Sequence, residues 1–259
     1  MSDGPASTDT AREAAYTADA VRAAEAPALA EGRPLMRWAA HALADVAAAE
    51  RRAAPGPLLV LVGAGDNGAD ALYAASELAS ATDAARVDVV LVRDRVHRAA
   101  LDTAVAAGAV VRQASEVCTA IEDYTVVLDG ILGIGRLADR RLRGSARAIV
   151  ECLMARERRP RIVAVDVPSG LDPDDGSADA AVLPADTTVT FGALKAGLVR
   201  GRGPELAGRV HLVDLGLDPY LRLAHPAITA PVELLRVGSP GAPTGAEQGG
   251  PAGVTRQRA

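Results

Sequence analysis

The chain has 259 residues, of which 49% are hydrophobic and 24% are charged, a composition typical of an ordinary globular protein with a sizeable core. Aromatic residues make up 2% and the net charge is −5, so the chain offers neither the aromatic platforms nor the basic stripe that nucleic-acid binding uses. We therefore expect a core of Ala, Val and Leu and no nucleic-acid partner.

Both ends of the chain are polar. The first ten residues, MSDGPASTDT, contain no apolar signal segment, and no run approaches the roughly 18 apolar residues of a membrane span. Gly, Pro, Ser and Ala dominate the C-terminal end. We predict a cytoplasmic protein without membrane contact, with disorder at 1–12 and 238–259 and one folded domain at 13–237.

Two helices are expected before the first strand. Thr17 is suited to cap a helix that runs to about Ala30, and Pro34 is suited to open a second helix from Leu35 to Arg52.

Short β-branched runs then alternate with longer Ala-rich stretches of helical period. This alternation predicts βαβ units and an α/β fold with a parallel sheet. The expected strands are LLVLV (58–62), VDVVLV (87–92), AVV (109–111), YTVVLD (124–129) and RIVAVDV (161–167). Afterwards TTVTF (187–191) and RVHLVDL (209–215) are separated by Gly and Pro with little helix, which favours antiparallel additions at one sheet edge.

Neither the cysteines nor the histidines show the spacing of a metal or redox site. Cys118 and Cys152 lie in apolar, helix-like surroundings and are expected to be buried and reduced. The four histidines are far apart in the sequence and do not support a zinc site.

The chemistry of a doubly wound sheet gathers at the carboxyl ends of its strands. The first such segment, VGAGDNGAD (62–70), combines the G-x-G-x-x-G pattern of dinucleotide sites with two carboxylates, Asp66 and Asp70. Carboxylates repel a pyrophosphate, so two interpretations remain open. The carboxylates cap the following helix, or one of them joins Asn67 in holding a cation or a polar ligand group.

Two later strand ends carry further candidates. The segment LDGILGIGR (128–136) ends a strand on Asp129 and continues as a glycine-rich turn, which is either an ordinary connection or a loop whose amides reach a ligand. The segment VAVDVPSGLDPDDG (163–176) presents Asp166, either as a structural turn residue or as a sheltered acid or base. Ser169 has no nucleophile-elbow motif around it, which argues against serine-hydrolase chemistry.

Together these motifs resemble those of the YjeF N-terminal domain family, the NAD(P)H-hydrate epimerases. VGAGDNGADAL resembles the family's G-x-G-N-N-G-G-D-G-L loop, LDGILGIGR its D-A-x-x-G-T-G turn, and AVDVPSGLDPDDG its A-[IV]-D-[IV]-P-S-G-x-x-x-x-x-G signature. The similarity continues through ADTTVTFGALKAGL (185–198) and GRVHLVDLGL (208–217), and it covers roughly residues 16–220.

The resemblance implies a Rossmann-like three-layer αβα sandwich, mostly parallel with extra edge strands after the third motif. It implies an enzyme, often a homodimer, that interconverts the R and S forms of hydrated NADH and NADPH. Asp166 would be its catalytic carboxylate, and Asn67, Asp129 and Ser169 would bind a potassium ion. The substrate contacts it implies are Asp66, Asn67, Gly68, Ala69, Asp70, Gly133, Ile134, Gly135, Arg136 and Asp166.

Some positions depart from the family motifs. Asp66, Ala69, Ala71, Ile134 and Arg37 stand where the family has Asn, Gly, Gly, Thr and an acidic residue. The added charge at Asp66 either strengthens cation binding or repels the phosphates of the substrate.

Two other functions compete with the epimerase. The first is a non-catalytic nucleotide-binding scaffold of the same fold. The second is an NAD(P)-dependent dehydrogenase, which no suitably placed His, Lys or Tyr set supports. Family members often carry a C-terminal dehydratase domain, so we expect either a separate dehydratase or a longer parent chain to complete the repair.

Overall fold

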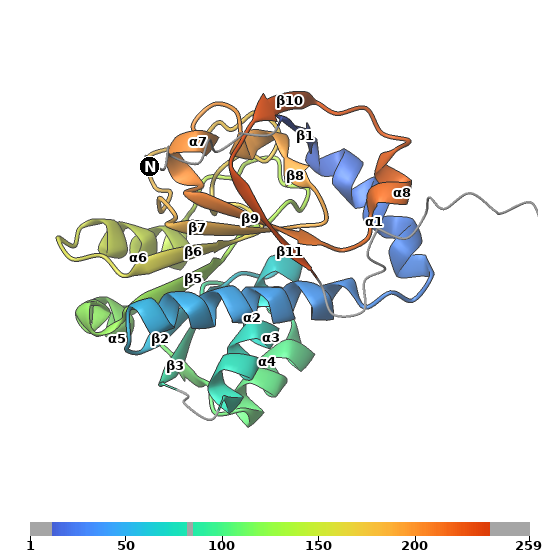
Figure 1. Cartoon of the computed structure of the whole chain (residues 1–259). Helices are drawn as coiled ribbons and strands as arrows, with labels where there is room; N and C mark the ends of the chain where they lie inside the picture. The colour runs from blue at the N-terminus through green and yellow to red at the C-terminus, as the bar shows by residue number, and fades with distance from the viewer. Residues whose placement is uncertain (1–11, 82–84, 239–259) are drawn as a thin grey trace, which may run out of the picture.

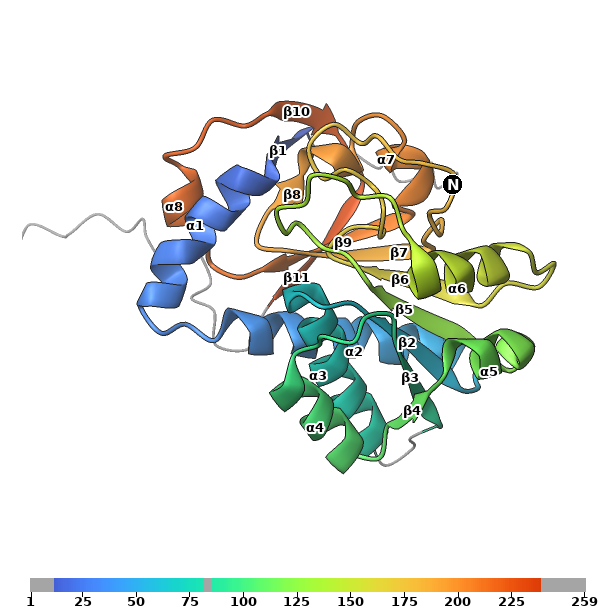
Figure 2. The ribbon, with the colours of Figure 1, turned by 180° about the vertical axis from the view of Figure 1, so that it is seen from behind.

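The computed structural model describes residues 12–81 and 85–238. The ends predicted to be disordered lie outside these residues, except Arg12 and Gly238, which belong to strands. The main sheet has the order β11-β9-β7-β6-β5-β2-β3-β4 (Figures 1 and 2). Its strands are β2 (Leu58–Val62), β3 (Val87–Leu91), β4 (Val110–Arg112), β5 (Val126–Gly130), β6 (Arg161–Val165), β7 (Thr187–Phe191), β9 (Arg209–Asp214) and β11 (Leu234–Gly238).

Each strand of this sheet runs parallel to its neighbours. The strand order reverses between β2 and β5, which makes this pair the topological switch point where open α/β sheets bind ligands. The predicted antiparallel orientation of the last strands is wrong. Between β7 and β9, residues 192–208 form β8, a 3₁₀ turn and α7, and this crossover returns the chain to the starting end of the sheet.

Helices cover both faces of the sheet and create the predicted three layers (Figures 1 and 2). Alternate side chains of β2 point to the two faces of the sheet. Leu58 and Val60 pack with the helices on one face, and Leu59 and Leu61 pack with the helices on the other. The first set is α2 (Leu35–Ala53), α3 (Asp66–Ser80) and α4 (Arg98–Ala106), and the second is α5 (Ala114–Thr119) and α6 (Gly144–Met154).

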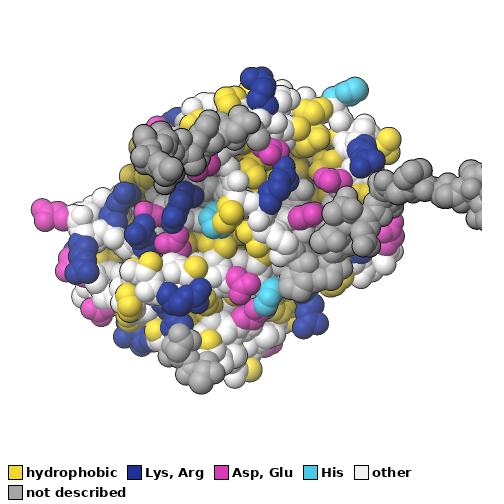
Figure 3. All heavy atoms as spheres, in the orientation of Figure 1, with side chains coloured by type: hydrophobic (Ala, Val, Ile, Leu, Met, Phe, Trp, Pro, Cys, Tyr) yellow, Lys and Arg dark blue, Asp and Glu magenta, His cyan; other side chains and the backbone are white. Residues whose placement is uncertain are grey.

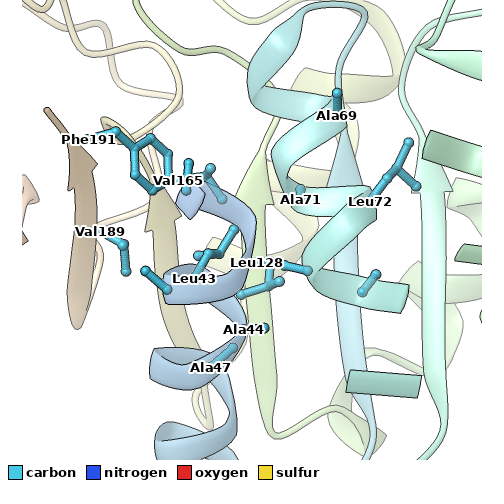
Figure 4. Close-up of a cluster of buried hydrophobic side chains, with 14 of the residues drawn as sticks. Leu43, Ala44, Ala47, Ala69, Ala71, Leu72, Leu128, Val165, Val189 and Phe191 are labelled. Carbon is cyan, nitrogen blue, oxygen red and sulfur yellow. The ribbon is translucent and has the colours of Figure 1, made fainter. Parts of the chain in front are cut away.

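Small aliphatic side chains build the core, as the composition predicts. In Figure 4, Leu43 and Ala47 of α2 lie over Leu128 of β5 and Val189 of β7. The predicted helix from Leu35 is confirmed, and its alanines allow the helix to lie close to the sheet.

The two cysteines are free, but they are half-buried rather than buried. Cys118 of α5 and Cys152 of α6 lie where these two helices meet, and the Cys152 Sγ is 3.6 Å from the Cys118 carbonyl oxygen. Burial raises the pKa of the Cys118 thiol to about 12, so this thiol stays protonated near neutral pH.

A second, three-stranded sheet has the order β10-β1-β8. Its strands are β1 (Arg12–Tyr16), β8 (Leu194–Lys195) and β10 (Ile228–Pro231), and β1 pairs antiparallel with β10 and parallel with β8. The sequence patterns did not predict β1. It leads directly into α1 (Ala18–Ala30), where Thr17 accepts a hydrogen bond from the Ala20 amide at 3.3 Å, so the predicted N-cap is confirmed.

Four short elements complete the described chain. They are the 3₁₀ turns η1 (Ile121–Asp123) and η2 (Ala196–Leu198) and the helices α7 (Gly203–Leu206) and α8 (Asp218–Leu221). Over 12–81 and 85–238, no helix is both long and apolar enough to span a bilayer. On the face in Figure 3, Arg side chains are interspersed with Asp and Glu, so the charges there are mixed.

Candidate active site

A cavity of about 580 Å³ lies beyond the carboxyl ends of β2 and β5, at the switch point. Its volume is within the roughly 300–1,000 Å³ of typical small-molecule sites. The loop after β2, the loop 131–143 after β5, Asp166 after β6, and Arg22 and Glu25 of α1 form its walls. Helix α1 therefore closes a site that the parallel sheet leaves open.

Glycines allow the two loops of the switch point to touch. A Cβ atom on Gly63 would lie 1.8 Å from the Ile131 carbonyl oxygen, and one on Gly133 would lie 2.8 Å from Asn67 Oδ1. The first separation excludes a side chain at position 63, and a side chain at position 133 would displace Asn67. The Asn67 side chain is consequently packed against the second loop.

The two carboxylates of the first loop have different environments. Asp66 is the exposed first residue of α3, whose N-cap Gly65 has no side chain to form a capping bond. Asp70 lies in the second turn and is buried, and its Oδ1 has no hydrogen-bond partner among the described residues. Capping of α3 therefore does not explain Asp70.

Asp166 is held in a constrained conformation at the end of β6. Its φ of 67° is the only positive value at a non-glycine residue in the described chain. Its amide donates to the Val189 carbonyl at 2.7 Å, and its Oδ1 is 3.3 Å from both the Thr190 hydroxyl and the Phe191 amide. Holding a non-glycine residue in such a backbone conformation costs about 1–3 kcal/mol of folding free energy, and residues of this kind are concentrated at functional sites.

Sequence reasoning did not identify Lys195 as part of the site. Its side chain is buried at the end of β8, and Nζ lies 2.5 Å from Asp166 Oδ1 and 2.7 Å from the Phe191 carbonyl oxygen. The sequence did contain a signal. The chain has 28 Lys and Arg residues, and Lys195 is the single lysine among them.

Glu25 is a second residue that the sequence analysis did not identify. It lines the cavity from α1, on the helix face that also carries the buried Val21 and Ala28. A carboxylate within an apolar helical stripe is the signal that could have revealed it. Burial raises the pKa of Glu25, and Lys195 partly offsets this effect.

The acidic floor of the cavity consists of Glu25, Asp66, Asp70 and Asp166. The pKa of Asp70 is raised well above its ordinary value, first by burial and then by the neighbouring charges of Asp166 and Asp66. Lys195 lowers this pKa by a smaller amount. Carboxylates thus outnumber ammonium groups in the floor, which favours a proton on at least one of them.

The residues suggested for potassium binding all contact the second loop. Asp129 Oδ2 accepts the Ser169 amide at 2.9 Å and Oδ1 accepts the Ile131 amide at 3.4 Å, while Ser169 Oγ accepts the Leu132 amide at 2.9 Å. Burial raises the pKa of Asp129, and the hydrogen bonds from Ser169 and Ile131 partly offset this. The buried Asn67 Nδ2 has no partner in the described structure.

These groups could hold a monovalent cation. The described residues contain no cluster of three or more His, Cys, Asp or Glu side chains suited to a metal. The available donors are an amide oxygen, a hydroxyl, one buried carboxylate and nearby carbonyl groups, which are hard ligands. The donor set therefore fits a cation that accepts neutral oxygen ligands.

Five arginines also line the cavity, and we call them the basic rim. They are Arg22, Arg93, Arg136, Arg141 and Arg143. Asp139 pairs with Arg141 at 2.8 Å and also with Arg143, and these guanidinium groups hold its pKa far below the usual range. The lining therefore contains both acidic and basic groups.

Most of the predicted substrate residues meet in this cavity. The lining includes Asp66, Asn67, Asp70, Gly133, Ile134, Gly135, Arg136 and Asp166. Gly68 and Ala69 do not line it, because Gly68 packs on the Gly63 backbone and Ala69 lies in the core. Substrate contact by all of these residues stays a prediction.

Comparison with known proteins identifies the family. The model described as YjeF-related protein N-terminus matches residues 32–197. The chain is 75% identical over 227 residues to a Microbacterium testaceum protein named NAD(P)H-hydrate epimerase, with 88% of each chain covered. It is 51% identical over 213 residues to a Clavibacter michiganensis protein of the same name, covering 78% of this chain and 90% of the relative.

More distant relatives are larger or share only the fold. A Mycobacterium tuberculosis protein named bifunctional NAD(P)H-hydrate repair enzyme Nnr is 39% identical over 218 residues, and the match covers 81% of this chain and 42% of that protein. A crystal structure of yeast YNL200c has a TM-score of 0.61 at 20% identity, covering 71% of this chain and 83% of that chain. The extent of the family match and the identity to these relatives show that the chain belongs to the YjeF-related protein N-terminus family.

Proposed function

We infer that the chain is an NAD(P)H-hydrate epimerase, an isomerase that interconverts the R and S forms of hydrated NADH and NADPH. Relatives that are 75% and 51% identical over most of both chains bear that name. The observation that carries the assignment to this cavity is Asp166, a carboxylate on strained backbone that lines the cavity beside the switch point.

The chemistry needs a positioned acid or base. Carbon 6 of the hydrate bears a hydroxyl next to the ring nitrogen, so its configuration can change by ring opening to an aldehyde or by loss and return of water. Both routes move a proton at that hydroxyl. Asp166 exchanges this proton: it accepts the hydroxyl proton for ring opening and returns it on closure, or it donates a proton for the loss of water and takes one back when water returns. The shape of the cavity holds the hydroxyl within reach of its carboxylate.

The charged groups that line the cavity orient the substrate. The dihydronicotinamide hydrate lies against the floor that contains Asp66, Asp70 and Asp166, where its hydroxyl and amide groups find polar partners. The phosphates of the dinucleotide lie at the basic rim, since guanidinium groups bind phosphate oxygens well.

The proposal includes a potassium ion bound by Asn67, Asp129 and Ser169. The buried Asp129 carboxylate has no cationic side chain paired with it among the described residues, and a monovalent cation would offset the cost of burying its charge. The ion would fix the first and second loops in register, which supports the wall of the cavity.

Two assembly expectations accompany this function. The S epimer requires a dehydratase to regain the intact cofactor, and the bifunctional repair enzymes among the relatives support such a coupling. We also expect a homodimer, which light scattering after gel filtration can measure.

The decisive experiment measures the epimerisation of purified R-NADHX at neutral pH, with potassium present and with S-NADHX removed by added dehydratase. We expect Asp166→Asn to lower the rate by about 100-fold or more, the scale of a lost acid or base. Asp214→Asn is the matched control, because Asp214 ends β9 at the same edge of the sheet and does not line the cavity.

Full activity in Asp166→Asn would remove Asp166 from its assigned role. A folded wild-type protein with no activity above the spontaneous rate would instead favour the non-catalytic scaffold. Asp66 and Ala69 would then be the first residues to change to the family's Asn and Gly.

A further inference from the structure

The ammonium group of Lys195 lies behind Asp166, away from the cavity. The cavity is lined by Asp166 and Phe191, but Lys195 is not part of its wall. Nζ contacts the two of them from the buried side, at 2.5 Å to Asp166 Oδ1 and 2.7 Å to the Phe191 carbonyl oxygen. Any effect of Lys195 on the substrate must therefore pass through Asp166.

We propose that Lys195 is the positioning residue of the epimerase, which holds the Asp166 carboxylate in place and aimed into the cavity. This inference rests on the proposed function. The Nζ contact fixes Oδ1 together with Thr190 and the Phe191 amide, which leaves the other carboxylate oxygen for the substrate hydroxyl.

Stability alone does not account for a buried ammonium at this position. Replacing a buried ion pair by apolar residues of similar volume is often neutral or stabilising. The chain uses Arg at every other basic position, yet here a compact point charge fits between one carboxylate oxygen and one carbonyl. A planar guanidinium fork is larger and has a different geometry.

Several carboxylates surround the pair formed by Lys195 and Asp166. Glu25 from α1 and Asp70 from α3 interact electrostatically with both members of the pair, and Asp66 interacts with Glu25 and Asp70. Arg140 from the second loop is a further cationic influence on Asp166. Without Lys195, the carboxylates of the floor would face one another with no ammonium group among them, and Asp166 would lose the contact that fixes Oδ1.

The test compares kcat and KM of Lys195→Met, Lys195→Gln and Lys195→Arg with those of the wild type. We expect Lys195→Met to lower kcat by about 100-fold while KM changes less than about threefold, since Lys195 does not touch the substrate. Lys195→Gln should lower kcat to a similar extent, whereas Lys195→Arg, which keeps a cationic donor, should restore part of kcat.

Arg209→Met is the matched control. It removes the cationic partner of another buried carboxylate, Glu50, at the opposite end of the sheet. We expect it to lower stability while kcat and KM stay as in the wild type. A folded Lys195→Met with the wild-type kcat would overturn the positioning role, and so would an effect confined to KM.

A second measurement keeps Lys195 in place, so it does not depend on whether the Lys195 variants fold. Because Lys195 is the only lysine, protein labelled with ¹⁵Nζ-lysine gives one side-chain resonance. We expect Asp166→Asn to shift this resonance and Arg209→Met to leave it unchanged. An unshifted resonance in Asp166→Asn would overturn the pairing whatever the activity, whereas an inactive wild type would overturn the proposed function.

Discussion

The two ends of the eight-stranded sheet both bury carboxylates, but they balance the charge in different ways. At the amino ends of the strands, Asp88 accepts a 2.6 Å hydrogen bond from Tyr124 and pairs with Arg86 at 3.0 Å and Arg112 at 3.5 Å. Glu50 likewise accepts from Thr187 at 2.8 Å and pairs with Arg209 at 2.6 Å.

At the carboxyl ends, the balance is incomplete. Asp70 Oδ1 has no partner among the described residues, and Asp129 has backbone amides and no cationic side chain. Lys195 is paired with Asp166, while Glu25 and Asp70 interact with the same pair. The amino end pairs its buried carboxylates with guanidinium groups, although Asp88 Oδ1 accepts no hydrogen bond among the described residues. The carboxyl end keeps buried carboxylates without a guanidinium partner in the described structure, which a ligand could satisfy.

The largest expected effect on stability is at the amino end. Tyr124→Phe removes the hydrogen bond to buried Asp88 and should lower the free energy of unfolding by about 1.5–3 kcal/mol. The change lies far from the cavity, so kcat should stay as in the wild type. Urea unfolding and the epimerase assay measure the two quantities, and a fall in kcat without a loss of stability would contradict this division between the ends.

At the carboxyl end, Asp70→Asn is expected to change the free energy of unfolding by a smaller amount and to raise it rather than lower it. The pKa of Asp70 is raised in the folded protein above the ordinary aspartate value of 3.8. The folded state therefore retains a proton that the unfolded chain releases, and stability falls as pH rises from about 3.8 toward the raised pKa. Asp70→Asn should thus raise the free energy of unfolding near neutral pH by about 1 kcal/mol, and activity should fall.

The pH dependence of the free energy of unfolding tests whether Asp70→Asn stabilises the protein for this reason. Below about pH 4, both the folded and unfolded chains carry protonated Asp70, so the gain in stability from Asp70→Asn should vanish. Asp66→Asn is the control, because that carboxylate is exposed and its removal should leave stability nearly unchanged. Equal stabilisation at acid and neutral pH would contradict the interpretation of Asp70 as a group that resists ionisation.

The smallest expected effect concerns the potassium ion. If the cation balances Asp129 as the arginines balance Asp88, replacing lithium with potassium should stabilise the wild type by up to about 1 kcal/mol at a concentration of a few times Kd. Asp129→Asn should lose this dependence, and Asp88→Asn should retain it. Thermal unfolding in both salts measures the effect, and equal melting temperatures for the wild type would argue against the ion.

Much of the fold was predictable because its signals are local. The apolar runs at 58–62 and 161–165 became strands, and Thr17 and Leu35 lie at the starts of helices where the sequence placed them. The direction of β7, β9 and β11 was not predictable from Gly and Pro content. The direction of a strand depends on whether the preceding connection returns the chain to the starting end of the sheet. Between β7 and β9, a connection with β8 and α7 does so with little regular helix.

The residues of the candidate site also fall into a predictable and an unpredictable group. The loops with Asp66–Asp70 and Gly133–Arg136, and the strand-end residue Asp166, were found from motifs and meet at one cavity. Glu25 and Lys195 were not found, because they come from α1 and β8, far from these motifs in the sequence.

The sequence by itself determined where strands end and which chemical groups follow them. A β-branched run followed by Gly and Asp is a local signal, because it depends only on a few neighbouring residues. Only the tertiary structure decided the charge state and surroundings of those groups. The pairing of Lys195 with Asp166 joins residues 29 positions apart, and the burial of Asp70 depends on packing. Electrostatic effects follow distance and burial in space, and neither quantity can be read from the order of residues.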